Sequence, residues 1–222
     1  MVKVTGENQD RFEGSRKFQE WLNGFNKKAA DLHTVEEGWS FWKGKSKDEI
    51  VFALLFLRCL DEESRERGDV VFFRSDAAAA FLVIENHDTG KKYIVLIEQL
   101  RIASGGKLLE IPAGGVEEGD DFLGTIVREV EEEVGLSIPV EDFKYLGWHY
   151  PSPGACNEKI ALYYSECVLT GNEIKKLEGK LTGTSGEHTK VRLCPMEDFE
   201  KLGIRDGKTL LAYLLYLKNA AK

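Results

Sequence analysis

The chain has 222 residues, of which 42% are hydrophobic, enough to form a sizeable core in one large domain or in a domain with a small partner. Its formal net charge is −8 at pH 7, whereas domains that bind nucleic acids usually carry a basic surface. A polynucleotide substrate is therefore disfavoured, while a small phosphate ester is not. No apolar run is long enough to span a membrane, and the four cysteines show no zinc-site spacing.

The beginning of the chain favours a cytoplasmic location. Residues 1–10 include acidic side chains and no hydrophobic stretch, so they resemble neither a signal peptide nor an obvious transit peptide. In the cytoplasm we expect the cysteines to remain reduced.

Residues 15–25 predict a short amphipathic helix with Ser15 as its capping residue. The apolar residues at helical spacing are Phe18, Trp21, Leu22 and Phe25. We expect this helix to pack on its own domain, with a dimer contact or an aromatic wall for a base as alternatives. The same alternatives apply to the aromatic residues that follow, which are Trp39, Phe41 and Trp42.

Four apolar segments rich in β-branched and aromatic residues predict strands of a mixed sheet. They are residues 50–57, 70–73, 78–84 and 93–97. The small side chains of residues 77–80 indicate either close approach of a backbone or ligand or, as we favour, tight packing under a helix. Just past the last of these strands, Arg101 is suited either to charge-assisted bonds with a diphosphate or to a surface salt bridge.

The centre of the chain predicts an amphipathic helix that begins at Asp120 or Asp121 and ends at Gly135. Its apolar stripe consists of Leu123, Ile126, Val127, Val130 and Val134. The other face carries Glu129, Glu132 and Glu133, whose mutual repulsion a hard divalent cation would offset. Arg128 can orient Glu132 from four residues before it. The alternative is a solvated acidic face without a ligand.

The C-terminal part predicts a strand at 145–150, a rigid Pro- and Gly-containing loop ending at Glu158, and a second strand at 160–164. Asn172 is expected to cap a short helix. The polar segment 182–189 precedes a strand at 190–193 and contains two candidate bases, Glu187 and His188. A last helix, capped by Asp206, closes the domain.

The central segment resembles the Nudix box, whose pattern is Gly-x5-Glu-x7-Arg-Glu-U-x-Glu-Glu-x-Gly-U, with U a bulky aliphatic residue. The match begins at Gly114 and is complete from Arg128 to Leu136. It departs from the pattern at Asp120, which stands where the family has its first Glu, so Asp120 is not expected to be a metal ligand.

Motifs outside the box resemble the ADP-sugar pyrophosphatases, and most closely the plant-type ADP-glucose and ADP-ribose hydrolases. These motifs are Glu98-Gln99-x-Arg101, residues 109–114, Ser152-Pro153-Gly154 with Glu158 after it, and a loop that carries Glu187. The resemblance implies an α/β Nudix fold, an α/β/α sandwich with a mixed sheet, in residues 69–222. It also implies an N-terminal extension or small subdomain in residues 1–68, and a homodimer to which that part contributes.

The resemblance also assigns roles to residues. The metal, Mg²⁺ or in its place Mn²⁺, would be held by Glu129, Glu132, Glu133 and the carbonyl group of Ala113. The substrate would be bound by Arg101, Glu98, Ser152, Gly154 and Glu158. Catalysis would involve Glu132, Glu133, Arg128 and, as the base, Glu187.

The predicted reaction is Mg²⁺-dependent hydrolysis of ADP-ribose or ADP-glucose, a small nucleotide sugar, to AMP and a sugar phosphate. Two alternatives remain open. One is another substrate, such as a UDP-sugar, NADH or a dinucleoside polyphosphate. The other is a Nudix-like domain that senses a nucleotide without cleaving it.

Overall fold

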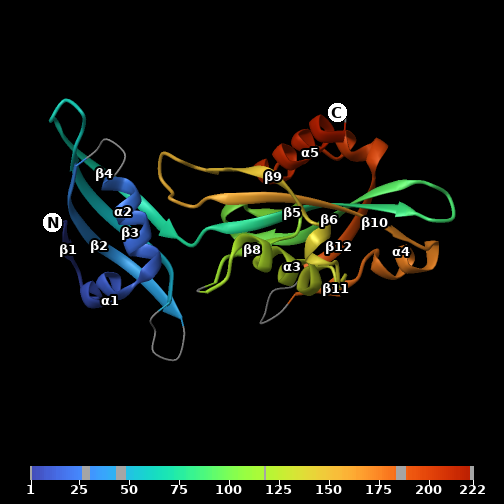
Figure 1. Ribbon diagram of the computed structural model, residues 1–222, viewed down its shortest axis with the longest axis horizontal. Coiled ribbons are helices and arrows are strands. Elements are labelled where there is room, and N and C mark those ends of the chain that lie inside the picture. Colours follow the sequence, from blue (N-terminus) through green and yellow to red (C-terminus); the bar gives the residue numbers. More distant parts are fainter. Residues whose placement is uncertain (1, 27–30, 44–48, 118, 184–188, 221–222) are drawn as a thin grey trace. The chain divides into compact units, whose positions relative to one another are not determined.

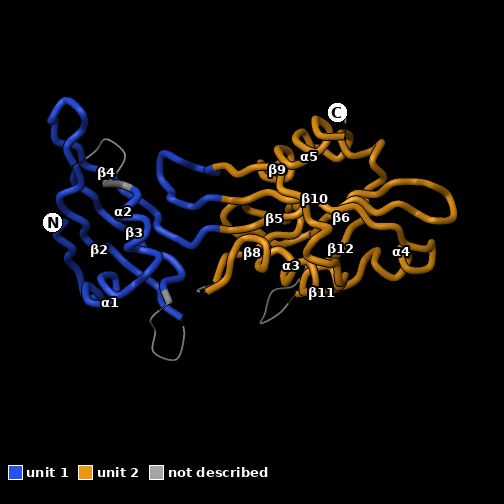
Figure 2. The backbone as a smooth tube through the Cα atoms, viewed as in Figure 1, with its two compact units in different colours: residues 1–76, 150–159 blue, residues 77–149, 160–222 orange. Residues whose placement is uncertain are grey.

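The computed structural model describes residues 2–26, 31–43, 49–117, 119–183 and 189–220. Its contacts divide the chain into two compact units (Figures 1 and 2). Unit 1 comprises Met1–Asp76 and Tyr150–Lys159, and unit 2 comprises Ala77–His149 and Ile160–Lys222.

Unit 1 is built on a four-stranded sheet with the order β1-β2-β3-β4. The strands are β1 (Lys3–Thr5), β2 (Asp31–Lys43), β3 (Glu49–Leu60) and β4 (Glu66–Arg74), and the helices are α1 (Gln9–Gly14) and α2 (Arg16–Asn26). The hydroxyl oxygen of Ser15 accepts a hydrogen bond from the backbone N–H of Phe18 at 3.3 Å, which confirms the predicted start of α2.

The two faces of this sheet differ sharply. Along β3 the buried residues Ala53, Leu55 and Leu57 pack with Phe12 and Phe18 of the two helices. The intervening residues point to the opposite face, because side chains alternate along a strand. With their cross-strand neighbours they form an exposed aromatic face, made of Trp39, Phe41, Phe52, Leu54, Phe56, Val70 and Phe72.

Segment Tyr150–Lys159 belongs to unit 1 because it binds the edge strand β4. The backbone N–H of Phe72 donates to the carbonyl oxygen of Ala155 at 2.8 Å. The side chain of Asn157 accepts from the N–H of Arg74 at 2.8 Å and donates to its carbonyl oxygen at 3.0 Å. The predicted rigid loop is therefore tied to a strand far from it in sequence.

Unit 2 is built on an eight-stranded mixed sheet with the order β11-β12-β6-β5-β10-β9, in which β7 also pairs with β6 and β8 with β5. Its strands are β5 (Ala77–Asn86), β6 (Lys92–Arg101), β7 (Gly106–Glu110), β8 (Ala113–Gly115), β9 (Lys144–His149), β10 (Ile160–Leu169), β11 (Leu181–Thr182) and β12 (Thr189–Pro195). Its α-helices are α3 (Phe122–Glu133), α4 (Gly171–Leu177) and α5 (Gly207–Ala220), and short 3₁₀ turns lie at Ile102–Ser104, Val140–Asp142 and Met196–Leu202.

Strand β5 lies at the centre of an α/β/α sandwich. Ala79 and Phe81 point to a core that includes Tyr213 and Tyr216 of α5, whereas Ala78 and Leu82 point to a core that includes residues of α3 and α4. The alanines also receive close backbones on both edges, since β10 and β8 pair with β5 there. The predicted sandwich is confirmed, and the small side chains serve both helix packing and backbone approach.

The structure changes two details of the sequence-based description, namely the number of sheets and the cap of α4. The four segments expected in one sheet are divided between two, because β3 and β4 pair only within unit 1. By its contacts β4 belongs to unit 1, and the division of the chain between residues 68 and 69 stays a prediction. The cap of α4 is Thr170, in a capping box with Glu173, and not Asn172, which lies inside the helix.

The described cysteines are free thiols at positions 59, 156, 167 and 194. None of the helices in the described part of the chain combines the length and the apolar character needed to cross a bilayer.

Candidate functional site

Two acidic side chains of α3, those of Glu129 and Glu133, lie against the short strand β8. The helix begins as predicted, with the Asp121 carboxylate accepting from the N–H of Gly124 at 2.6 Å, and its apolar residues Ile126, Val130 and Val134 are buried in the core. The opposite side of the helix therefore carries the glutamates. Glu133 is 6% exposed, and its Oε2 atom accepts from the N–H of Ala113 at 3.0 Å.

Glu129 lies directly against Gly114 in β8. A Cβ atom added at Gly114 would lie 2.0 Å from the carboxylate carbon and from Oε1 of Glu129. Atoms that are not bonded cannot approach so closely, so the glycine leaves the space that the carboxylate occupies. Neighbouring Gly115 has no such restriction, since a Cβ added there meets no atom within 4 Å. The first glycine of the motif is thus explained by packing.

Arg128 bridges two of the glutamates. Its Nη1 atom lies 2.7 Å from Oε1 of Glu129 and 3.3 Å from Oε2 of Glu132, and Nη2 makes a long contact of 3.5 Å with the carbonyl oxygen of Gly115. Burial would lower the pKa of the guanidinium, but the nearby carboxylates of Glu129 and Glu132 outweigh it and raise the pKa. Arg128 is therefore a fixed cation between the helix and β8.

The donor set suits a hard divalent cation. Glu129, Glu132 and Glu133 bring several carboxylate oxygens together beside the guanidinium of Arg128, and oxygen ligands are the ones that Mg²⁺ and Mn²⁺ prefer. Within the described residues no three His, Cys, Asp or Glu side chains form a closed metal cluster, and Arg128 instead contacts two of the carboxylates. The predicted ligands Ala113, Glu129, Glu132 and Glu133 do lie on adjoining elements.

The C-terminal end of α3 is fixed by Gly135 and by two residues at or just before β11, Lys180 and Thr182. Gly135 has φ of +76°, and an added Cβ would lie 2.0 Å from Nζ of Lys180. The hydroxyl group of Thr182 donates to the carbonyl oxygen of Glu133 at 2.6 Å. The left-handed glycine predicted from the sequence is confirmed, and it also makes room for a lysine near the negative end of the helix dipole.

The predicted substrate ligand Arg101 is held by a buried carboxylate. Its Nε and Nη2 atoms donate to the two oxygens of Glu110 at 2.7 and 2.8 Å, a bidentate pair. Nζ of Lys208 contacts the same carboxylate from α5. The hydrogen bond that Arg101 donates to Glu110 contributes most to raising the pKa of Arg101.

Glu110 is charged at any ordinary pH. Burial alone would raise its pKa, but Arg101 and Lys208 outweigh burial and lower the pKa to about 2. Sequence reasoning missed both Glu110 and Lys208. Lys208 stands 98 residues from Glu110, so no local pattern could have paired them.

Glu98 lies in a separate ion-pair group. Its carboxylate contacts Lys107 at 3.2 Å and Arg192 at 3.2 Å, and Arg192 also contacts Glu178 at 3.4 Å. The Lys107 and Arg192 side chains lower the pKa of Glu98. These contacts assign Glu98 structural partners, and its role in substrate binding stays a prediction.

The remaining predicted ligands lie in unit 1 or outside the described residues. The carbonyl oxygen of Ser152 accepts from the N–H groups of Ala155 and Cys156, and a Cβ at Gly154 would meet nothing within 4 Å. Glu158 is buried and pairs with Arg74 at 3.2 Å, an arginine that sequence reasoning missed. Glu187, the predicted base, and the other candidate, His188, lie outside the residues that the structure describes.

Comparisons with known proteins place the site in a family. Residues 75–213 match the model of the NUDIX domain. The chain is 37% identical over 169 residues to "Nudix hydrolase 14, chloroplastic" of Arabidopsis thaliana, which covers 70% of this chain and 54% of that protein. It is 32% identical over 146 residues to "ADP-ribose pyrophosphatase" of Bacillus subtilis (strain 168), covering 64% of this chain and 74% of that protein.

The fold also has a solved counterpart. A structure titled "Crystal structure of ADP compounds hydrolase" aligns with a TM-score of 0.59 at 15% identity, covering 87% of this chain and 95% of that chain. This likeness concerns the fold alone. The chain spans about half the length of the Arabidopsis relative, with 54% of that protein matched. With the family match covering the unit that carries the acidic helix, the chain belongs to the NUDIX domain family.

Proposed function

We propose that this protein hydrolyses the diphosphate linkage of an ADP-sugar, ADP-ribose or ADP-glucose, to AMP and a sugar phosphate, with a divalent metal ion as cofactor. Water adds to one phosphorus atom, the bridging P–O bond of the diphosphate breaks, and the proton of the water passes to a base. The names of the relatives support this reaction, since they include ADP-ribose pyrophosphatases and an ADP-sugar pyrophosphatase of Mus musculus.

The observation that carries the proposal is the packing of acidic side chains against β8. A solvated acidic helix face would leave its carboxylates in water. Here Glu133 is buried on the N–H of Ala113, and the Glu129 side chain is only 13% exposed, against Gly114. Charged groups are seldom buried without a partner that offsets the cost of desolvation. Arg128 contacts Glu129 and Glu132, and a divalent cation bound by the same carboxylates would stabilise their charged forms further.

Each residue then has a defined task. When bound, the cation, for which we propose Mg²⁺ with Mn²⁺ as a substitute, supplies charge neutralisation and a lowered pKa for water. Glu129, Glu132 and Glu133 hold it, with the carbonyl oxygen of Ala113. Arg128 keeps the glutamates oriented.

The remaining tasks concern the substrate and the proton. Arg101 binds the diphosphate oxygens, because its guanidinium is half-exposed and already oriented by Glu110. Glu98, Ser152, Gly154 and Glu158 remain proposed substrate contacts, and Glu187 remains the proposed base.

A substrate panel tests the function. ADP-ribose, ADP-glucose, UDP-glucose and NADH are incubated with the protein in Mg²⁺, in Mn²⁺ and in EDTA, and the products are separated by chromatography. We expect AMP from an ADP-sugar with either metal and none in EDTA. Binding of ADP-ribose without release of AMP in either metal would contradict hydrolysis and identify a sensing domain.

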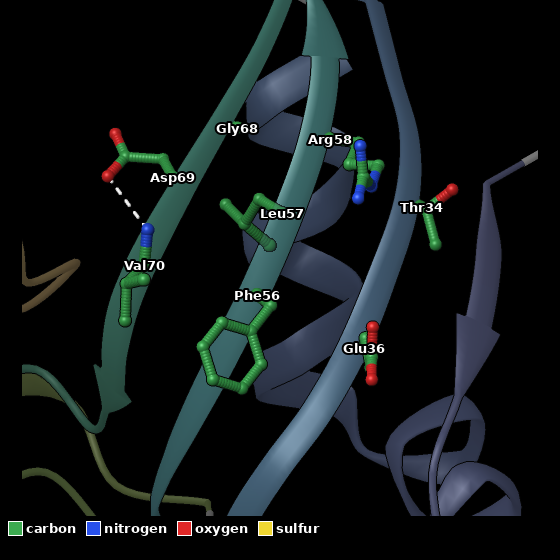
Figure 3. Close-up of a pocket in the computed structure, with 8 residues that line it drawn as sticks. All are labelled: Thr34, Glu36, Phe56, Leu57, Arg58, Gly68, Asp69 and Val70. Atoms are coloured by element: carbon green, nitrogen blue, oxygen red, sulfur yellow. Dashed lines mark hydrogen bonds between the residues drawn. The ribbon is translucent and has the colours of Figure 1, made fainter.

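We also propose that the protein is a homodimer formed through the exposed aromatic face of unit 1. Exposed apolar surface gathered on one sheet face is typical of interaction sites. At one end of this face lies an open depression of about 640 Å³, whose lining includes Arg58, Glu36 and Asp69 (Figure 3). Charges of both signs suit a self-complementary interface between two copies.

The division into domains and the cellular compartment stay predictions. We retain residues 69–222 as the catalytic part and 1–68 as the dimer-forming extension, although compactness places β4 with the extension. The sequence favours the cytoplasm, whereas the name of the Arabidopsis relative places that protein in the chloroplast.

A further inference from the structure

Glu110 is the centre of a buried charge network in unit 2. Its side chain is 5% exposed, and it receives two cations: Arg101 through a bidentate pair and Lys208 through Nζ. The Lys208 side chain is 10% exposed, whereas that of Arg101 is 43% exposed. Of the two cations, only Arg101 can therefore also reach a ligand in solvent.

Lys208 is itself held by the start of α5. Its Nζ atom lies 3.1 Å from Oδ2 of Asp206. The same Asp206 oxygen accepts from the N–H of Thr209 at 3.0 Å and from its hydroxyl group at 2.5 Å. Lys208 thus joins the capping residue of α5 to Glu110.

A second hydrogen bond to α5 fixes Ile111, the residue after Glu110. The hydroxyl oxygen of Thr209 accepts from the N–H of Ile111 at 2.9 Å. Glu110 is thus held through its side chain and Ile111 through its backbone, by consecutive residues of one helix. Two residues after Ile111, the N–H of Ala113 donates to the carboxylate of Glu133.

The charges explain why an ammonium group is needed here. The carboxylates of Glu110 and Asp206 contact the same Nζ atom, so removing it would leave two like charges facing each other in a buried place. Glu110 would then rotate away from Asp206, and the guanidinium paired with it would move as well.

Sharing the carboxylate also matters for binding. With Lys208 present, the negative charge of Glu110 is divided between two cations, which leaves Arg101 attractive to an anion. Lys208 therefore affects both where the guanidinium lies and how strongly it attracts a phosphate.

We propose that Lys208 is a positioning residue, which acts through Glu110 to orient the guanidinium of Arg101 for the diphosphate of the substrate. The diphosphate part of this statement rests on the proposed function. The orientation of Arg101 does not, and it can be measured in the ligand-free protein. The competing possibility is that Lys208 only stabilises the fold.

The first measurement is solvent exchange of the Arg101 Nε–H proton by NMR, in wild type and in Lys208→Met. We expect exchange about tenfold faster in the variant, because the hydrogen bond to Glu110 weakens. Lys218→Met, which removes the same charge from an exposed position of α5, is the control and should match wild type. Unchanged Arg101 exchange in Lys208→Met would overturn the proposal. If Lys208→Met does not fold, the measurement is made on Lys208→Gln, which keeps a hydrogen-bond donor but removes the charge.

The second measurement is a double-mutant cycle with Arg101→Ala, scored by KM and kcat for an ADP-sugar. A residue that acts through Arg101 should raise KM about tenfold in the wild-type background, with kcat changing less, and have almost no effect when Arg101 is absent. An equal loss in both backgrounds would assign Lys208 a purely structural role. If wild type cleaves no ADP-sugar, the proposed function fails, and the exchange measurement still decides the inference.

Discussion

The carboxylate of Glu129 occupies the space where a side chain at Gly114 would begin. A Cβ atom there would lie 2.0 Å from Oε1 and 2.6 Å from Oε2 of Glu129. The backbone conformation of Gly114 does not require glycine, since its φ is not among the positive values. The requirement comes from the glutamate alone, which joins β8 to α3.

Gly114→Ala should therefore displace Glu129 and weaken metal binding. We expect activity to fall about 10–100-fold, the range seen when the support of a metal ligand is lost. Kinetics at increasing Mg²⁺ would measure it. Gly115→Ala is the matched control, because a Cβ there meets nothing within 4 Å, and an equal loss in both variants would contradict the explanation.

Removing one negative charge from the acidic face should impair catalysis more than folding. Glu132→Gln is expected to lower kcat by about 100-fold or more, since several kcal/mol of charge stabilisation depend on the metal ligands. Glu131→Gln removes the same charge from an exposed position of the same helix and should retain activity. Undiminished turnover of Glu132→Gln in saturating Mg²⁺ would remove Glu132 from the metal site.

Glu110 makes the stability of the protein decrease at acid pH. Its pKa is lowered from 4.5 to about 2 in the folded state, so its ionised form stabilises the fold above pH 4.5, and this contribution is lost as pH falls towards 2. The shift corresponds to a contribution on the order of 3 kcal/mol. Urea unfolding of wild type and Glu110→Gln should give a difference that is full at pH 7 and narrows below about pH 4.5. A difference independent of pH would contradict this assignment.

A charge placed on the exposed aromatic face should prevent dimer formation. Phe56 is 43% exposed and belongs to the row of cross-strand neighbours that includes Val70. We expect Phe56→Lys to give a monomer in analytical ultracentrifugation at a concentration where wild type is a dimer, because a lysine is costly to bury without a partner. Leu214→Lys, at an exposed position of α5, is the control and should leave the dimer intact. Loss of the dimer only in Leu214→Lys would move the interface to α5.

The predicted base is tested by the pH dependence of the rate. Glu187→Gln cannot accept a proton, so we expect kcat to fall and the acidic limb of the pH–rate profile to disappear. Glu187→Asp should restore part of the activity. A profile in Glu187→Gln with the wild-type shape would assign the base to another residue.

Patterns among neighbouring residues in the sequence were sufficient to predict α3. The period of its apolar residues, the capping aspartate and the left-handed glycine all act within a few residues of one another, so the helix, its buried stripe and its acidic face were correctly predicted. The resemblance to the Nudix box rested on the same local spacing, and the family match confirms it. Only the choice between Asp120 and Asp121 as the cap needed the structure.

Tertiary structure decided which distant residues meet. Alternating side chains identify a strand and its buried face but not its partner, so the sequence could not assign β3 and β4 to a sheet separate from β5 and β6. Likewise, nothing near Arg101 or Glu110 indicates Lys208, because their contact depends on the packing of α5 on the central sheet. The sequence by itself determined the acidic helix, whose interactions are local, and only the folded chain determined the network that holds Arg101, whose contacts are not.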